Sequence, residues 1–294
     1  DNFNYSIHRL ADWKDLDLDW AIFGFRKCGT SSLAYNLGLH PEIQLVATHD
    51  VVLEHNLLQQ SRSFLPLERH VRQFSSAARG FSIPVADHPD LVKGASKFTA
   101  NKGARMGEDS VLPKRRPLVG VKTTTVDHRL LGGPEGEQGS RVQLLLHSIL
   151  LDAKPHLKVF FMIRDPVECV FSHLKWQSPK SSYSLLWGQI GNCIQPSSHS
   201  VEDTAACTEA LRLCWQSEYL HTLCSRRTCT RNNLALLLTP QASDPLALAV
   251  AMRFLGVDTG FARAGVNFSA RNRNSFEQLD IGVRAAARKF YDDE

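Results

Sequence analysis

Short apolar runs alternate along this chain with longer segments in which apolar residues recur at helical spacing. The runs lie at 20–25, 43–47, 118–122, 157–163 and 234–238. A continuous apolar run of this length, bounded by turn residues, is typical of a strand buried on both faces. Helical spacing covers 30–39, 140–152, 166–176, 201–225, 245–255 and 276–290. This alternation predicts an α/β fold: an open, mostly parallel sheet flanked by helices.

The first apolar run leads into a loop bracketed by Gly24 and Gly29, and a predicted helix follows. Backbone N–H groups of such a loop and of the first helical turn point at one spot, where the helix dipole also favours negative charge. A triphosphate loop has this glycine spacing but places its lysine directly after the second glycine. Here Thr30 follows Gly29, and Lys27 lies two residues before it. The loop therefore predicts a phosphate site that differs from the usual ATP loop.

A second segment of the same kind follows a later strand. The run at 159–163 ends in Arg164-Asp165-Pro166, and Ser172 follows on a predicted helix. Ligands in open parallel sheets bind at the carboxyl ends of the strands. We therefore expect the two segments to meet at one site, although about 135 residues separate them.

These segments resemble those of the sulfotransferases that use 3′-phosphoadenosine 5′-phosphosulfate. Residues 25–33 are similar to the family's 5′-phosphosulfate loop, and His40-Pro41 is similar to the pair that follows it. Arg164 and Ser172 match the segment that holds the 3′-phosphate. A looser match covers 234–238, Asp244-Pro245 and Phe254-Leu255-Gly256, so that the resemblance runs from about residue 20 to about 256.

The resemblance implies a P-loop NTPase-like sulfotransferase fold in a single domain over 1–294. It implies an enzyme whose donor is 3′-phosphoadenosine 5′-phosphosulfate, whose product is 3′-phosphoadenosine 5′-phosphate, and which needs no metal. The residues that it assigns to donor binding are Arg26, Lys27, Cys28, Gly29, Thr30, Ser31, Ser32, Arg164, Ser172 and Arg271.

Lys27 occupies the position of the family's catalytic lysine. Negative charge builds on the bridging oxygen when a sulfuryl group leaves a phosphate, and an ammonium there stabilises that charge and protonates the leaving group. Lys122, in the segment 120–125, is similar to a second lysine that faces the transferring group and the acceptor in the glycan enzymes. The glutamate and proline of that glycan motif are missing here, and a strand-end lysine paired with an acidic neighbour is the alternative interpretation.

A base must take the proton of the acceptor. The glycan sulfotransferases have a glutamate about nine residues after the His-Pro pair, and here His49 falls at about that spacing. An imidazole with a pKa near neutrality suits this task. We predict His49 as the base, oriented by Asp50 or Asp127, with a surface histidine as the alternative interpretation. The other candidates for the base are Glu54, His55 and His128.

Charge and composition bear on the acceptor. A basic excursion from the core is predicted at about 80–117, where lysine and arginine cluster with glycine and proline. This excursion can attract an anionic carbohydrate, and a solvated loop is the alternative interpretation. We expect the acceptor to be a carbohydrate or another hydroxyl-bearing molecule. The net charge of +4 over 294 residues is too small to indicate nucleic-acid binding.

Cysteines suggest where the protein resides. We expect Cys28 and Cys169, which lie in the two phosphate segments, to stay out of disulfides. The other five lie in a predicted insertion at about 177–231, where the spacings 193 to 207 and 224 to 229 can close loops. Disulfides there predict an oxidising compartment, the Golgi lumen or secretory pathway, and the sequons at Asn4 and Asn267 agree. A zinc site, or free thiols in a cytoplasmic protein, are the alternatives.

Two other functions stay open at this point. A small-molecule or nucleotide kinase on this scaffold needs a carboxylate that holds Mg²⁺, and Asp165 is the obvious candidate. A non-catalytic protein that binds the donor nucleotide is the third possibility. No apolar run approaches the roughly 18 residues of a membrane span. We expect membrane contact only through an N-terminal anchor that precedes Asp1.

Overall fold

A computed structural model describes residues 12–25, 27–46, 71, 74–75, 116–123, 147–165, 168–169, 172, 216–224 and 229–263. The strands are β1 (Trp20–Gly24), β2 (Ile43–Val46), β3 (Leu118–Lys122), β4 (Lys158–Ile163) and β5 (Leu234–Leu238). The helices are α1 (Thr30–Gly38), α8 (Gln216–Cys224), α9 (Pro245–Leu255) and α10 (Gly260–Arg263), with short 3-10 turns η1 (Trp13–Asp15) and η4 (Thr239–Ser243). Residues 147–153 are also helical.

The five strands form one parallel sheet in the order β2-β3-β1-β4-β5. This confirms the predicted α/β class with a parallel sheet between helices. The strand bounds agree with the apolar runs, except that β1, β2 and β4 are each one residue shorter than predicted. Of the predicted helices, α1 ends one residue early and α9 has the predicted bounds.

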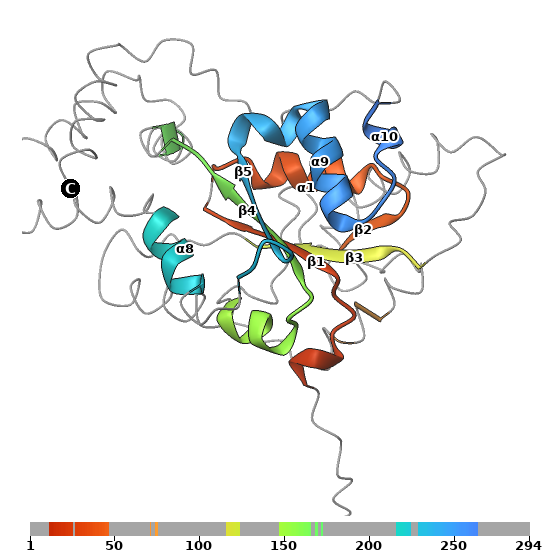
Figure 1. Cartoon of the computed structure of the whole chain (residues 1–294), viewed down its shortest axis with the longest axis vertical. Helices are drawn as coiled ribbons and strands as arrows, with labels where there is room; N and C mark the ends of the chain where they lie inside the picture. The colour runs from red at the N-terminus through yellow and green to blue at the C-terminus, as the bar shows by residue number, and fades with distance from the viewer. Residues whose placement is uncertain are drawn as a thin grey trace, which may run out of the picture.

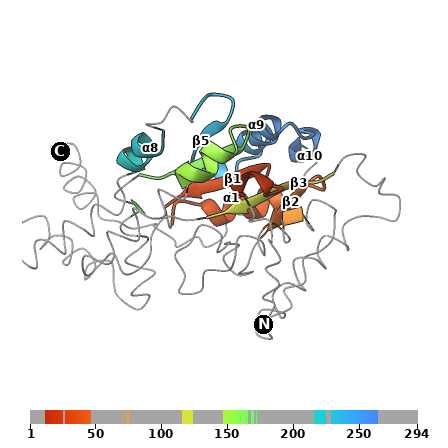
Figure 2. The same ribbon diagram turned by 90° about the horizontal axis from the view of Figure 1, so that it is seen from below.

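Helices cover both faces of the sheet (Figure 1). One face carries α1, α9 and α10, and the Phe160 ring meets Phe254 of α9 edge to face. The other face carries α8, whose Tyr219 stacks on Phe161, and the helical residues 147–153. Figure 2 shows residues 147–153 in front of the sheet when it is viewed from below. There Phe23 stacks on His147, with the ring centroids 4.0 Å apart. The central strand β1 is therefore buried along its whole length.

Capping residues set the start and the end of α9 where the sequence suggests. Asp244 precedes the helix and accepts a hydrogen bond from the Ala247 amide at 2.9 Å, and Pro245 occupies the first helical position, where no N–H is needed. Gly256 follows the last turn in a left-handed conformation. These caps explain why the boundaries of this helix are readable from sequence alone.

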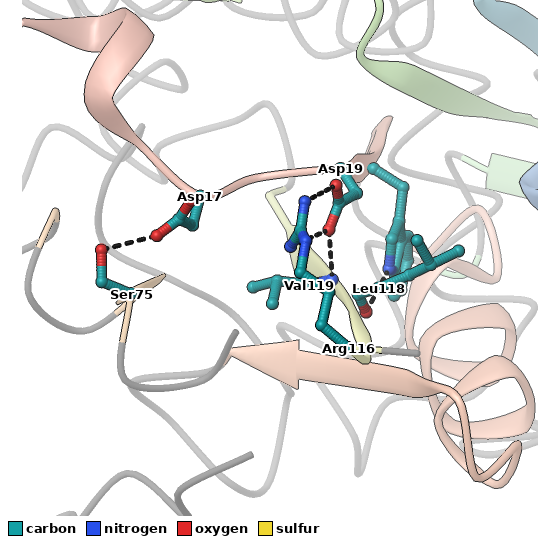
Figure 3. A network of polar contacts seen from close by, with 7 residues as sticks. Asp17, Asp19, Ser75, Arg116, Leu118 and Val119 are labelled. Atoms are coloured by element: carbon teal, nitrogen blue, oxygen red, sulfur yellow. Dashed lines mark hydrogen bonds and ion pairs between the residues drawn. The ribbon is translucent and has the colours of Figure 1, made fainter. Parts of the chain in front are cut away.

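A charged network lies at the amino ends of the strands, which we call the amino edge of the sheet (Figure 3). The Asp19 carboxylate accepts hydrogen bonds from both terminal nitrogens of Arg116, at 2.7 and 3.0 Å, and from the Val119 amide at 2.8 Å. Asp19 precedes β1 and Arg116 precedes β3, so these bonds fix where the two strands begin relative to each other. The carboxyl edge, where loops must adapt to a ligand, is opposite.

Several predictions fall on residues that the structure does not describe. They include the basic excursion at about 80–117 except for its last two residues, the predicted helix at 276–290 and most of the insertion at about 177–231. The single-domain organisation over 1–294 stays a prediction. Among the described helices, none is long and apolar enough to cross a membrane.

Candidate phosphate-binding site

The site lies where the direction in which strands are added to the sheet reverses. The chain leaves β1 toward β2 on one side of the sheet and leaves β4 toward β5 on the other, so the crevice between the ends of β1 and β4 is the switch point. In open α/β sheets, ligands bind in this crevice at the carboxyl ends of the strands. Both predicted phosphate segments begin there.

The loop after β1 has the backbone of an anion cradle. Lys27 adopts a left-handed conformation with φ of 66°, and Gly29, the residue before α1, has φ of 85°. Successive turns of this kind direct backbone N–H groups into a concavity. Gly29 supplies no side-chain cap, and the first turn of α1 contains no acidic residue. The start of α1 therefore favours negative charge.

Two glycines let this loop approach the neighbouring strands closely. A Cβ atom on Gly24 would lie 3.1 Å from the Met162 carbonyl oxygen of β4. A Cβ atom on Gly29 would lie 3.1 Å from the Thr239 methyl group, and its left-handed backbone already disfavours a side chain. The loop thus packs onto the ends of β4 and β5 through backbone surface.

Arg164 joins the two predicted segments. It follows β4, and its Nη1 donates a hydrogen bond of 2.6 Å to the carbonyl oxygen of Lys27. Its Nε lies 3.5 Å from the Glu168 carboxylate one turn along the chain. Ser172, on the same segment, is buried. The two segments thus contact each other through Arg164.

Lys122 reaches the start of α1 from the end of β3. It is only 1% exposed, and its Nζ donates a hydrogen bond of 2.8 Å to Ser31 Oγ. Ile22 of β1 is the neighbour of Lys122 in the sheet, which directs the lysine toward the face that α1 covers. The Lys122 amino group thus lies beside the place that we expect to hold an anion.

Thr239 is a component that the sequence did not suggest. It directly follows β5, and its hydroxyl lies 2.9 Å from the Cys28 carbonyl oxygen and 3.1 Å from that of Ile163. The hydroxyl has one proton and donates to one of these oxygens at a time. A hydroxyl residue immediately after an apolar strand run is the signal that could have identified it.

The remaining residues that were predicted to bind the sulfuryl donor or to act as the base divide into two groups. Cys28, Thr30 and Ser32 are buried in the loop or the first turn of α1. Arg26, His49 and Arg271 lie outside the described residues, as do the alternative bases Glu54, His55 and His128 and the orienting candidates Asp50 and Asp127. Their predicted roles are therefore untested.

His40 of the His-Pro pair has a structural role. The Glu42 amide donates to its Nδ1 at 3.1 Å, so the ring proton lies on Nε2, which donates to the Asp258 carbonyl oxygen at 3.1 Å. The imidazole ties the turn before β2 to the segment before α10.

The described residues hold no group of three His, Cys, Asp or Glu side chains placed to bind a metal ion. Cys224 and Cys229 form a disulfide, one of the two pairings that the spacing allowed, while Cys193 and Cys207 are outside the described part. Neither Cys28 nor Cys169 forms a disulfide, as expected.

No protein-family model and no curated protein matches the chain. Among solved structures, the chain is similar to a sulfotransferase from Alicyclobacillus acidocaldarius, with 16% sequence identity and a TM-score of 0.49. The similarity covers 94% of this chain and 92% of that one.

Proposed function

We propose that this chain is a sulfotransferase that moves the sulfuryl group of 3′-phosphoadenosine 5′-phosphosulfate to a hydroxyl or amine group. The observation that carries the proposal is the hydrogen bond from Arg164 to the Lys27 carbonyl. It joins the loop that resembles a 5′-phosphosulfate site to the segment that resembles a 3′-phosphate site. A nucleotide with phosphates at both positions is a ligand that would engage both.

The contact between Lys122 and Ser31 argues against a kinase. Ser31 lies two residues after Gly29, where a triphosphate loop has the hydroxyl that binds Mg²⁺. In this chain that hydroxyl accepts a hydrogen bond from the Lys122 ammonium. The Lys122 amino group thus takes the place where a kinase would hold the metal, and no lysine follows Gly29 to contact a γ-phosphate.

The proposed chemistry uses positive charge held in place before the reaction. The donor supplies a sulfuryl group on a phosphate leaving group, and amides at the start of α1 hold that phosphate. Lys27 stabilises the charge that develops on the bridging oxygen and gives it a proton. Lys122, already fixed by Ser31, adds a second positive charge at the same edge of the sheet.

We propose a carbohydrate as the acceptor and His49 as the base that takes its proton. We also propose that the protein works in the Golgi lumen or secretory pathway. The disulfide between Cys224 and Cys229 supports this location, because such bonds persist in oxidising compartments.

Calorimetric titration with 3′-phosphoadenosine 5′-phosphate tests the donor site. We expect micromolar or tighter binding that is unchanged by EDTA, and no comparable binding of ATP with Mg²⁺. Transfer from ³⁵S-labelled donor to a panel of carbohydrates then tests the reaction. We expect Lys27→Ala to lower kcat by about 10²–10³-fold or more, the size of effect that removal of one transition-state donor has.

The matched control is Lys14→Ala, since the Lys14 side chain is 65% exposed and forms a surface ion pair with Asp12. It should leave binding and transfer unchanged. Tight nucleotide binding without transfer to any acceptor would indicate a non-catalytic nucleotide-binding protein. Binding of ATP only with Mg²⁺ would indicate a kinase instead.

A further inference from the structure

Two free thiols meet inside the proposed donor site. The sulfur atoms of Cys28 and Cys169 lie 3.6 Å apart, although the residues are 141 positions apart in sequence. Cys28 belongs to the phosphate loop, and Cys169 lies on the helical segment that follows Arg164. Their side chains are 0% and 2% exposed. The described structure thus has a buried thiol pair at the contact between the two predicted phosphate segments.

The backbone around Cys28 is held on every side. Its amide donates to the Phe25 carbonyl at 3.3 Å, and its carbonyl oxygen lies 2.9 Å from the Thr239 hydroxyl. The carbonyl of the preceding residue, Lys27, accepts the hydrogen bond from Arg164. Any displacement of Cys28 therefore changes the same loop that would hold the phosphate.

We propose that Cys28 and Cys169 are a redox-modification site at which a peroxide joins the two sulfurs and thereby weakens anion binding by the loop. One thiolate attacks hydrogen peroxide and becomes a sulfenic acid, with release of water. The second thiol attacks that sulfur, a second water leaves, and a disulfide forms. Two thiols are oxidised and one peroxide is reduced to two waters. This inference rests on the proposed function in one respect, namely that the anion bound by the loop is the nucleotide.

Geometry explains why the bond would alter the loop. The sulfurs must approach from 3.6 Å to about 2.05 Å, the length of a disulfide. A binding constellation works only while its groups stay within about 0.5 Å of their productive positions. The approach exceeds this tolerance, and any part of it that the Cys28 side takes up displaces the loop.

Burial explains why the pair stays reduced until the loop opens. The hydrogen bond with Cys169 and the loss of solvent raise the pKa of the Cys28 thiol well above its ordinary value. A neutral, buried thiol reacts slowly, because the thiolate is the nucleophile. A bound anion holds the loop closed. Coupling between two events is reciprocal, so if oxidation weakens binding of the anion, the bound anion must also disfavour oxidation.

The test uses the full chain, reduced with dithiothreitol, and hydrogen peroxide as oxidant. Trypsin releases Cys28 in the peptide 28–62 and Cys169 in the peptide 165–175, each with a single cysteine. Mass spectrometry can therefore identify the bond directly. We expect the linked peptide, a rise of at least tenfold in the Kd of 3′-phosphoadenosine 5′-phosphate, and recovery with dithiothreitol. Saturating nucleotide should slow formation of the link at least tenfold.

Cys169→Ser cannot form the link, and its affinity should withstand peroxide. Cys169→Ala serves the same purpose if the serine variant does not fold. The control that lacks both Cys224 and Cys229 should respond to peroxide as the natural chain does. Absence of the linked peptide, a linked protein with unchanged affinity, or an equal loss of affinity in Cys169→Ser would each overturn the inference.

Failure of the proposed function has a different signature. The reduced protein would then bind no nucleotide, while the linked peptide would still be measurable. Inorganic phosphate is the probe in that case. Slower linking with phosphate present would support the thiol pair as a site coupled to anion binding, and an unchanged rate would overturn it.

Discussion

Thr239 holds the phosphate loop against the sheet through one hydroxyl group. Thr239→Val keeps the methyl group that packs beside Gly29 and removes the hydrogen bonds to the Cys28 and Ile163 carbonyls. We expect a loss of about 1–2 kcal/mol in the free energy of unfolding, the usual cost of a missing buried hydrogen bond. The Kd of 3′-phosphoadenosine 5′-phosphate should rise about fivefold to tenfold.

Urea unfolding and calorimetric titration measure these two effects. Thr239→Ser is the matched control, because it retains the hydroxyl and loses only the methyl group. Its nucleotide affinity should stay close to that of the natural chain. A loss of affinity in Thr239→Ser with none in Thr239→Val would show that the methyl contact, and not the hydrogen bond, positions the loop.

At the scale of elements, Gly120 determines how β1 and β3 pack. It is the neighbour of Trp20 in the sheet, and the indole lies over the place where a side chain would be. A Cβ atom on Gly120 would lie 1.9 Å from Trp20 Cε2, and the indole is fully buried. We expect Gly120→Ala to lower the free energy of unfolding by about 3 kcal/mol or more, because a packed core cannot absorb the overlap.

Gly256→Ala is the control for the loss of a glycine as such. Gly256 has φ of 80°, and a Cβ atom there would meet no atom within 4 Å. Its cost should be the conformational one, about 1 kcal/mol. Urea unfolding of both variants compares the two effects, and equal losses would contradict the steric argument.

At the scale of the whole molecule, His147 makes stability depend on pH. The ring is buried between Phe23 and Tyr219, shares a hydrogen bond with the Tyr219 hydroxyl, and has no partner for Nε2 within the described structure. Burial lowers the pKa of His147 to about 3. In the unfolded chain a histidine has a pKa of about 6.5, so the unfolded state binds more protons between these values.

Stability is therefore complete above about pH 6.5 and falls as the pH falls toward 3. From pH 7.5 to pH 5 this one group should remove about 2 kcal/mol from the free energy of unfolding. Urea unfolding at both pH values measures the loss. His147→Phe, which can still stack on Phe23, should reduce the difference by that amount, whereas His221→Gln on the exposed side of α8 should not. An unchanged difference in His147→Phe would contradict the assignment.

The sheet order gives the molecule two unlike edges. The amino edge is held by the charge network of Asp19 and Arg116, and the carboxyl edge carries the loop, Lys122, Arg164 and Thr239. Strand β1 runs into the loop, and β3, β4 and β5 each end with or lead into a residue that contacts the loop or the start of α1. Stability and ligand contact are thereby assigned to opposite ends of the same strands.

The sequence by itself determined the elements and the loop. Apolar runs marked the strands because a strand buried on both faces must be apolar throughout, and Asp244, Pro245 and Gly256 marked the ends of α9 because capping is local. The two phosphate segments were likewise readable, since glycine spacing and a basic residue lie within a few positions of one another. Lys27 and Arg164 were identified in this way.

Only the tertiary structure decided which of these groups touch. Three contacts depend on the sheet order. Arg164 donates a hydrogen bond to the Lys27 carbonyl, Lys122 donates one to the Ser31 hydroxyl, and the Cys28 sulfur lies next to the Cys169 sulfur. The sequence lacks this information, because each contact joins residues that lie 91 or more positions apart. Which strands become neighbours is decided by how the buried faces pack together, and no local pattern encodes that choice.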